Sequence, residues 1–564
     1  MGGDREATKA EKALHDQTDI LPLKKLLVVF ATLAVTLLVS FIDQNGISVT
    51  LPTIAADLNA GATISWAGTS SLIANTTFQM LYGRFSDIFG RKAVFLTAIG
   101  LLSLGDLLCG CSQNAAMFYV FRAVAGIGGG GITNLAMIIV SDVVTLEQRG
   151  KYQGILGSMV GLGNVLGPFL AAAFMERATW RAFFFMLAPL GVVVGIIAFV
   201  FLPSKPREDS FKNSAKKIDY AGSLTSSLGV ILVLIPISGG GAYFPWNSAM
   251  VISMLTIGGL ALVSFVIVEW KFAKLPMMPV SIFKNKVIVV LLTQSFLFGA
   301  VYQSYLYYVP LYLQNAHQFS VIQSAAIYIS LVVCQSLFSI LSGQYISRVK
   351  RYGEVIWAGF GLWTLGAGLT LIYERDTRPG IIVIPLLIIG IGVGFIFQPT
   401  LVAMQAHSIK SRRAVITSNR NFFRCAGGAC GLAVSAAVLQ ATLRANLPPE
   451  FGDLSNSTYS IPQLDEQDMS RVLDAYMAAS RAVFILQIPL IGLCFLGCFF
   501  IKDRGLTPID DEKNSATSSA SRDEEEGPST EKQPGNEEQS SDGQILSTTL
   551  SANPRGVDRR TGSP

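Results

Sequence analysis

The sequence contains little charge. Only 14% of its 564 residues are Asp, Glu, Lys or Arg, whereas soluble proteins carry about 25%. Hydrophobic residues make up 51% of the chain, and apolar runs of about 20 residues, the length that crosses a hydrocarbon core, recur from Leu26 to Ile501. This composition excludes a soluble fold, and it predicts an all-α integral membrane protein with about fourteen transmembrane helices.

Histidine and cysteine are also scarce. The three histidines lie outside the expected mid-membrane regions, and the seven cysteines lie in or beside apolar runs without the spacing of zinc ligands. We therefore expect no metal, no cofactor and no enzymatic activity. The net charge of +5 is spread over short loops, which argues against a nucleic-acid partner.

Nucleotide-binding motifs are incomplete or out of context. Gly150-Lys151 is followed by Tyr152 and not by Ser or Thr, so this stretch does not match the phosphate-binding loop, and the sequence gives no sign of ATP-driven transport. The stretch Gly126–Gly131 matches the dinucleotide fingerprint, but it lies inside an apolar run with no preceding strand, so its glycines are expected to serve packing. An ion gradient or the gradient of the substrate itself is the expected driving force.

The apolar runs define the expected organisation. An N-terminal cytoplasmic tail covers 1–25, a six-helix bundle covers 26–202, and cytoplasmic loops with two extra helices cover 203–286. A second six-helix bundle covers 287–501, and a disordered cytoplasmic tail covers 502–564. The expected spans are Leu26–Val49, Ile64–Tyr82, Ala93–Cys111, Ala116–Val140, Gln153–Phe174, Phe183–Leu202, Tyr220–Ile237, Met250–Val268, Val287–Leu311, Ile322–Ile346, Val355–Ile372, Ile381–Met404, Ala414–Val438 and Val483–Ile501.

Lysine and arginine are distributed unevenly between alternate loops. The richer set, in which we count Arg84, Lys151 and Arg420, exceeds the other by roughly three to one and is assigned to the cytoplasm together with both termini. A glycosylation sequon at Asn456 lies in the loop 442–479, which the same rule places outside the cell. Asn456 is therefore a candidate glycosylation site.

A polar loop follows the second expected span. It reads Gly83-Arg-Phe-Ser-Asp87-Ile-Phe-Gly90-Arg91-Lys92. Asp87 and Arg91 are four residues apart and can pair on a helical end, while Gly83 and Gly90 permit close approach of another backbone. A weaker echo of this loop follows the tenth span at Gly343–Gly353, which an internal repeat explains.

Four stretches together resemble one family. The polar loop is similar to the signature loop of the major facilitator superfamily, and three further stretches resemble motifs of its drug:proton antiporter branch with fourteen spans. The residues in these motifs are most similar to those of fungal members. Two features depart from the pattern: Ala171-Ala172 replaces a usual glycine pair, and Ile88 replaces a commonly basic residue. The three further stretches are Asp43 to Leu51-Pro52, Phe121-Arg122 to Gly126-x-Gly128, and Gly161-x-Gly163 to Gly167-Pro168.

Asp43 and Arg122 are the candidate proton-coupling residues. Both are ionisable groups in apolar spans, where such groups are costly unless they face a partner or a wet cavity. The resemblance assigns Arg122 to proton coupling, and a buried pair that merely locks two helices together is the alternative. Asp106 is ranked lower, because it lies near the outer end of its span and is expected to reach the membrane interface.

The remaining candidates fall into three groups. The signature loop and gate comprise Gly83, Asp87, Gly90, Arg91 and Lys92, and the antiporter motif comprises Gly161, Gly163, Gly167 and Pro168. Arg424 is expected either to line the pathway or to contact the loop near Asp87. Candidates for lining a central cavity are Gln44, Asn45, Gln79, Asn134, Tyr302, Gln303, Tyr305, Gln398, Gln405 and Arg424.

The resemblance implies two six-helix bundles related by a pseudo-two-fold axis, with two linking helices between them. It predicts a monomeric proton-coupled antiporter of the plasma membrane that exports small amphipathic molecules, such as drugs, toxins or secondary metabolites, by alternating access. The small molecule, protons and the lipid bilayer are its expected partners. The alternatives are a vacuolar transporter of basic amino acids and a non-transporting membrane receptor or scaffold. The scarcity of acidic residues in the spans favours neutral or varied substrates over cations.

Overall fold

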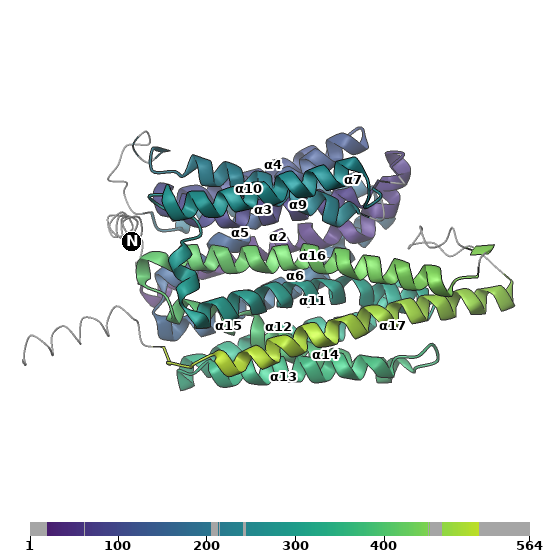
Figure 1. Ribbon diagram of the computed structural model, residues 1–564. Helices are drawn as coiled ribbons and strands as arrows, with labels where there is room; N and C mark the ends of the chain where they lie inside the picture. The colour runs from purple at the N-terminus through teal and green to yellow at the C-terminus, as the bar shows by residue number, and fades with distance from the viewer. Residues whose placement is uncertain are drawn as a thin grey trace, which may run out of the picture. The chain divides into compact units, whose positions relative to one another are not determined.

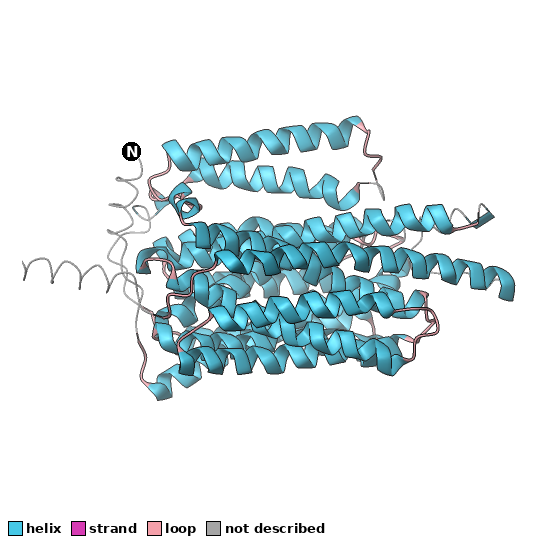
Figure 2. Cartoon of the chain, turned by 60° about the horizontal axis from the view of Figure 1, so that its bottom comes forward, coloured by secondary structure: helices cyan, strands magenta, loops and turns pink. Residues whose placement is uncertain are grey.

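The structure is a computed structural model in which the described part of the chain is helical. No strand occurs among the described residues, where one isolated bridge joins Gly240 and Phe244 (Figure 2). The expected tails, apart from residues 20–25 and 502–506, and the candidate glycosylation site Asn456 lie outside the described residues. The residues described are 20–60, 63–204, 213, 215–240, 244–448, 450–451 and 465–506.

Two sets of six long helices flank an inserted pair (Figure 1). The first set is α2 (Leu23–Asp57), α3 (Trp66–Phe89), α4 (Arg91–Gly110), α5 (Ala115–Val143), α6 (Leu146–Arg177) and α7 (Trp180–Phe201). The inserted pair is α9 (Tyr220–Gly239) and α10 (Ala249–Lys271). The second set is α11 (Lys286–Asn315), α12 (Val321–Val349), α13 (Gly353–Leu369), α14 (Pro379–Phe397) continued by α15 (Pro399–Ala406), α16 (Arg413–Asn446) and α17 (Glu466–Gly497). Short 3-10 turns occur at Val280–Lys284, Thr370–Ile372, Lys410–Arg412 and Cys498–Phe500.

Thirteen segments of the described chain are long and apolar enough to cross a membrane. Helix α3 is not among them, because Asn75, Thr76, Thr77 and Gln79 lower its hydropathy. It is nevertheless 24 residues long and packs against α5 and α16, so its polar side chains face protein and not lipid. With α3 as the fourteenth helix, the expectation of about fourteen transmembrane helices is confirmed.

The helix contacts repeat between the two sets. In the first set α2 packs on α6, α3 on α5, and α4 on α5 and α7; in the second set α11 packs on α16, α12 on α14, and α13 on α14 and α17. The two bundles meet through α6 on α12 and through α3 on α16, which are equivalent pairs under the same correspondence. This pattern confirms the internal repeat and the fold of two six-helix bundles with two linking helices.

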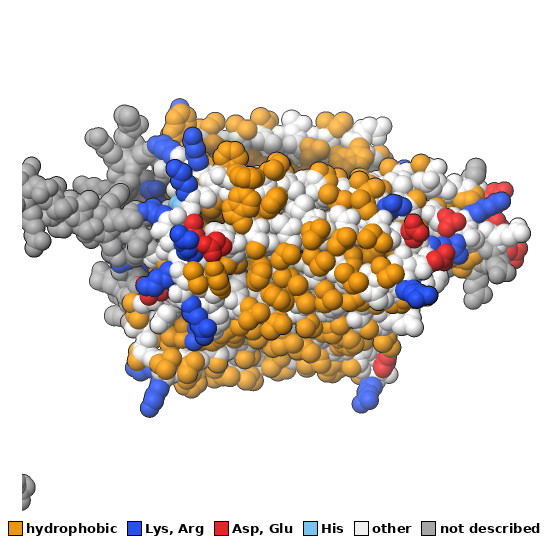
Figure 3. Space-filling model, turned by 90° about the horizontal axis from the view of Figure 1, so that it is seen from below, with side chains coloured by type: hydrophobic (Ala, Val, Ile, Leu, Met, Phe, Trp, Pro, Cys, Tyr) orange, Lys and Arg blue, Asp and Glu red, His pale blue; other side chains and the backbone are white. Residues whose placement is uncertain are grey.

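Charge is distributed unevenly along the helix axes. On the face shown in Figure 3, a band of hydrophobic side chains separates one end, where Lys and Arg outnumber the acidic side chains, from the other end, where both signs of charge also occur. We call the former the basic end; it carries Arg84, Lys151 and Lys350, and the charge rule assigns it to the cytoplasm. The opposite end is called the far end.

The last two helices run further than hydropathy predicted. Helix α16 continues to Asn446 and α17 begins at Glu466, whereas the expected spans ended at Val438 and began at Val483. Helix therefore occupies both ends of the expected loop 442–479, over 442–446 and 466–479. Hydropathy detects the stretch that lies in lipid, but polar residues can extend a helix beyond that stretch at no cost in desolvation.

An ion pair ties α2 to α7 at the far end. Arg181 Nη1 lies 2.5 Å from Asp57 Oδ2, and the Trp180 indole donates to the same oxygen at 3.0 Å. The hydrogen bond from Arg181 and then the one from Trp180 lower the pKa of Asp57; burial raises it by less, and the nearby charge of Arg181 lowers it slightly further. Since a lowered pKa favours the ionised native form, the stabilisation is present at neutral pH and is lost as pH falls through the lowered value.

The Asp57 pair gives a pH-dependent prediction. Asp57→Asn is expected to lower the melting temperature of the detergent-solubilised protein at pH 7, because the amide keeps the shape but loses the charge. The difference from the unsubstituted protein should shrink below about pH 4, where an ordinary Asp becomes protonated. Thermal unfolding followed at both pH values tests this, and an equal difference at both would show that the charge contributes nothing.

Candidate functional site

Asp43 on α2 and Arg122 on α5 form a buried ion pair inside the first bundle. Arg122 Nη1 donates to Asp43 Oδ1 at 2.5 Å, and the two side chains are only 1% and 4% exposed. The ring of Phe184 on α7 faces the guanidinium, with 5.8 Å between Arg122 Cζ and the ring centroid. The two residues chosen from the sequence are thus brought together, in a geometry that serves either a proton site or a lock between α2 and α5.

Asp106 on α4 belongs to the same cluster, and the expectation that it reaches the interface is wrong. It is 1% exposed, Arg122 Nη1 lies 3.8 Å from its Oδ1, and neither carboxyl oxygen has a hydrogen bond. The reason is close helix packing: a Cβ at the neighbouring Gly105 would lie 2.5 Å from the Ala125 amide nitrogen on α5. In the sequence, Gly105 next to Asp106 indicates that this face of α4 packs against another helix.

The signature loop forms a charge cluster at the basic end. Arg91 lies 2.6 Å from Asp87 Oδ1, as its spacing predicted, and 2.7 Å from Asp142 Oδ2 on α5. Gly90 has a φ of +87°, a conformation that L side chains rarely adopt. Lys92 instead lies over the Phe199 ring of α7 at 5.1 Å, so it faces the outside of this cluster.

The two bundles are joined between the signature loop and the middle of the membrane. A methyl group at Gly83 would overlap Ser418 Oγ and lie 3.1 Å from the Ala414 carbonyl on α16. Asn134 on α5 donates to Ser418 Oγ at 2.7 Å and accepts from Asn421 at 3.2 Å. These contacts hold α3 and α5 of the first bundle against α16 of the second.

A second set of contacts closes the basic end between α6 and α12. Gln153 donates to Gln405 Oε1 at 3.3 Å, and Lys350 pairs with Glu147 at 2.6 Å. The Lys151 amide donates to Ser347 Oγ at 3.0 Å. Gln405, expected to line a central cavity, therefore belongs to the closure at this end.

The contact between Lys151 and Ser347 predicts a reversible crosslink. In the double variant Lys151→Cys, Ser347→Cys, oxidation is expected to form a disulfide in the closed conformation, because the Lys151 amide nitrogen lies 3.0 Å from Ser347 Oγ and the two residues are neighbours across the interface, and so to stop transport. Each single variant should stay active, since only Cys111 among the native cysteines is exposed and it lies at the far end. Gel mobility and transport before and after reduction measure this, and full activity in the crosslinked protein would contradict a moving interface.

The glycines of α6 lie where other helices approach closely. A Cβ at Gly163 would be 2.5 Å from Phe41 Cβ, and one at Gly167 would be 2.8 Å from the Ile42 carbonyl, both on α2. At Gly161 a Cβ would overlap Ser336 Oγ on α12. Pro168 lies inside α6, where it removes a backbone hydrogen bond. The motif therefore sits against α2 on one face and at the bundle interface on the other.

A chain of polar side chains crosses the bundle interface near the middle of the membrane. Asn45 on α2 donates to Asn164 Oδ1 at 2.9 Å, and Asn164 donates to the Tyr302 hydroxyl of α11 at 3.2 Å. Tyr302 donates in turn to Gln335 Oε1 at 2.9 Å. Gln398 is buried nearby against the Gly157 position, and its amide oxygen and nitrogen have no hydrogen bond.

Arg424 on α16 presents an uncompensated charge next to this chain. Its guanidinium lies over the Phe397 ring, 5.5 Å from the centroid, and Phe397 in turn packs against Tyr302 with 6.4 Å between ring centroids. Its Nε is buried without a hydrogen bond. Among the described residues no carboxylate pairs with Arg424. Arg424 thus lies beside Phe397 at the bundle interface, and its place in the pathway stays a prediction.

Arg420 lies one helical turn before Arg424 and was missed in the sequence. It was counted with the cytoplasmic loops, but it is 3% exposed and donates to the Phe397 carbonyl, to Thr400 and to Asn421. Its position inside the expected span Ala414–Val438 was the signal. Arg420 thus uses its two terminal nitrogens on protein acceptors, although its Nε, like that of Arg424, has no hydrogen bond.

The other lining candidates are divided between different places. Gln79 donates to Asn75 Oδ1 at 2.9 Å inside the first bundle, and Gln303 packs against the Gly428 position. Tyr305 stacks on Phe484 with 6.1 Å between centroids, so it belongs to the core of the second bundle. Gln44 is half-buried, and no contact assigns it a role.

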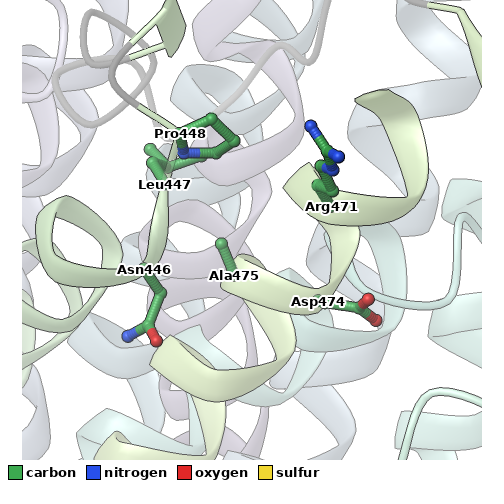
Figure 4. A pocket seen from close by; sticks show the side chains of 6 residues that line it. All are labelled: Asn446, Leu447, Pro448, Arg471, Asp474 and Ala475. Atoms are coloured by element: carbon green, nitrogen blue, oxygen red, sulfur yellow. The ribbon is translucent and has the colours of Figure 1, made fainter. Parts of the chain in front are cut away.

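A surface cavity at the far end is separate from this site. Its volume is about 430 Å³, and Figure 4 shows its six lining side chains around the end of α16 and the start of α17. Asn446 is 22 residues beyond Arg424, or roughly 33 Å along a helix. The cavity therefore contributes nothing to the mid-membrane site. It is lined by Asn446, Leu447, Pro448, Arg471, Asp474 and Ala475.

Comparisons with known proteins agree with this architecture. The family model described as Major Facilitator Superfamily matches residues 33–432. Citrate exporter 1 of Yarrowia lipolytica is 49% identical over 92% of this chain and 78% of its own length, and the MFS-type transporter clz4 of Cochliobolus lunatus is 43% identical over 90% and 91%. Efflux pump dotC of Dothistroma septosporum is 33% identical over 72% and 70%.

A solved structure supports the same fold. The human organic anion transporter MFSD10 (TETRAN) matches 85% of this chain and 100% of its own with a TM-score of 0.56. The sequence identity is 16%, so this likeness concerns the arrangement of helices alone.

Proposed function

This chain belongs to the major facilitator superfamily, and from that premise we propose that it exports small organic anions, carboxylates above all, in exchange for protons. It is a multi-pass membrane transporter of the fungal type, as its relatives are. The observation that carries the proposal is the free guanidinium of Arg424 at the bundle interface.

An unpaired arginine at membrane depth is expensive and is kept where it has a partner in the working cycle. No carboxylate among the described residues pairs with Arg424, so a substrate carboxylate is the counter-charge. A guanidinium binds a carboxylate through two parallel N–H···O bonds. The Tyr302 hydroxyl and the unbonded amide of Gln398 supply further polar contacts for hydroxyl or additional carboxyl groups.

The relatives support the same substrate class. A protein named as a citrate exporter is 49% identical to this chain over most of both lengths. The vacuolar uptake of basic amino acids becomes less favourable, since Arg424 and Arg420 would repel a cationic side chain at the same depth. A receptor or scaffold would have no use for an unpaired cation inside its bundle interface.

Export of neutral amphipathic compounds is the second candidate. The rings of Phe298, Tyr302 and Phe397 pack together beside Arg424, and such a surface suits aromatic toxins. A relative is named as an efflux pump. Both candidates share alternating access: the contacts at the basic end must break before substrate enters, and α6 and α12 must then separate.

Proton coupling belongs to the proposal through Asp43 and Arg122. Their pair holds α2 against α5, and α2 also carries Asn45, the first member of the polar chain that reaches Tyr302. A change of protonation near Arg122 therefore bears on the helix that contacts the substrate site. Protons entering down their gradient would reset the carrier after the anion leaves; we place this exchange at the plasma membrane.

The test uses purified protein in liposomes. Vesicles are given labelled citrate, or a labelled neutral aromatic dye as comparison, on one side and an imposed pH difference. We expect citrate to move only with the protein and faster with the pH difference, and to stop with a proton uncoupler. Transport of the dye but not of citrate would replace the anion assignment by the efflux-pump candidate. Citrate movement indifferent to the pH difference would remove proton exchange.

A further inference from the structure

Three ionisable side chains share one enclosed site in the first bundle, and two of them are acids. Asp43 comes from α2, Asp106 from α4 and Arg122 from α5, and each is no more than 4% exposed. The other groups that face the site are Cys109 on α4, which is fully buried, and the ring of Phe184 on α7. One positive charge thus stands against two carboxyl groups.

The two acids stand in different relations to the arginine. Asp43 Oδ1 accepts a hydrogen bond from Arg122 at 2.5 Å. Asp106 Oδ1 lies 3.8 Å from the same nitrogen, beyond hydrogen-bond range, and neither Asp106 oxygen has any other hydrogen bond. An ionised carboxylate buried without donors is strongly disfavoured, whereas a neutral carboxylic acid tolerates this environment.

Aromatic packing keeps water away from Asp106 on the side of the far end. Phe118 on α5, one turn before Arg122, packs edge-to-face with Trp180 and Phe184, with centroids 5.6 and 5.7 Å away. All three side chains are at most 2% exposed. Solvent therefore cannot offset the negative charge that two ionised acids would leave beside one arginine.

We propose that Asp106 is the carboxyl group that binds the transported proton, while Asp43 remains the ionised partner of Arg122. This inference rests on the proton exchange of the proposed function and names its proton site. In the conformation closed at the basic end, Asp106 carries the proton as a neutral acid. When the O–H bond breaks and the proton leaves, the Asp106 carboxylate competes with Asp43 for Arg122.

That competition connects the proton to the substrate site. If Arg122 turns from Asp43 toward Asp106, α2 loses its hold on α5, and α2 is the helix that packs closely on the α6 glycines and carries Asn45. A Cβ at Gly46, next to Asn45, would lie 3.1 Å from the Gly167 carbonyl, so α2 and α6 are expected to move together. Asn164 on α6 then shifts against the Tyr302 hydroxyl, which lies beside Arg424.

The experiment compares four variants of the full chain in liposomes. Asp106→Asn removes the proton site, Asp106→Glu restores a carboxyl group, Asp43→Asn tests the other acid, and Asp474→Asn, an exposed acid at the far end, is the matched control. Asp106→Asn is expected to lose about tenfold or more of the citrate flux driven by a pH difference, the size of a typical coupling factor, while citrate–citrate exchange at equal pH continues. Asp106→Glu should recover part of the driven flux.

Infrared difference spectroscopy supplies a readout that does not depend on transport. The C=O stretching band of a buried protonated carboxyl should be present in the unsubstituted protein and in Asp474→Asn, and absent in Asp106→Asn. Loss of this band in Asp43→Asn but not in Asp106→Asn would overturn the proposal and move the proton to Asp43. Failure of the unsubstituted protein to respond to pH would count against the proposed function, while the band would still locate the proton.

Discussion

Replacing Arg424 by glutamine is expected to abolish the movement of carboxylates through this protein while leaving it folded. Among the described residues, no side chain or backbone group forms a hydrogen bond or ion pair with the Arg424 side chain. Its removal should therefore not destabilise α16. A buried charged partner removed from a complex typically costs about 2–5 kcal/mol, roughly 30-fold or more in affinity. Labelled citrate binding and counterflow in liposomes measure the effect.

Controls separate the charge of Arg424 from its shape. Arg424→Lys keeps the charge without the two-pronged geometry and should retain part of the affinity. Arg471→Gln removes an exposed arginine at the far end and should change nothing. If Arg424→Gln transports citrate normally but loses an aromatic substrate, the site would be one for neutral amphipathic molecules, and the anion assignment would be wrong.

Replacing Arg122 by leucine is expected to have the largest effect on stability. It leaves Asp43 and Asp106 buried without a cation, and removal of one partner from a buried ion pair costs about 3–5 kcal/mol. Asp43→Asn should cost less, because the amide still accepts a hydrogen bond from Arg122. Thermal unfolding in detergent ranks the variants by stability. Unfolding is followed as the loss of the monodisperse peak in size-exclusion chromatography.

A double variant tests whether the pair is a lock or a working part. The double variant Arg122→Leu, Asp43→Asn lacks both charges of the pair, so no unpaired carboxylate is left at position 43. Its stability should therefore recover relative to Arg122→Leu alone. Transport driven by a pH difference should not recover, since no arginine remains to respond to the proton. If stability and driven transport return together, the pair is only a connection between α2 and α5, which was the alternative raised by the sequence.

Most of the architecture follows from local sequence properties. Each apolar run of about 20 residues must satisfy its own backbone in lipid, and a helix does so without help from distant residues. The positions of Asp43 and Arg122 within such runs were enough to mark them, because a charge at that depth needs an explanation whatever surrounds it. The pairing of Asp87 with Arg91 followed from a spacing of four residues on one helix.

Other predictions failed where the answer depended on distant segments. Asp106 lies four residues from the end of α4, so the sequence allowed it to reach the interface, but Arg122 and the packing against α5 hold it inside. Arg420 was placed in a loop by a rule that counts charges near span ends. Tyr305 and Gln405 were grouped as lining residues, although one lies in the core of a bundle and the other at the basic end.

The sequence by itself determined that the chain is a membrane bundle with repeated halves, because hydropathy and helix formation act over one or two turns. Only the tertiary structure decided which acid faces Arg122 without a hydrogen bond, and which arginine of α16 is left free beside Tyr302. The physical reason is that the state of a buried charge depends on partners from several helices. Those partners are brought together by helix packing, and the number of residues that separate them in the sequence does not predict which of them meet.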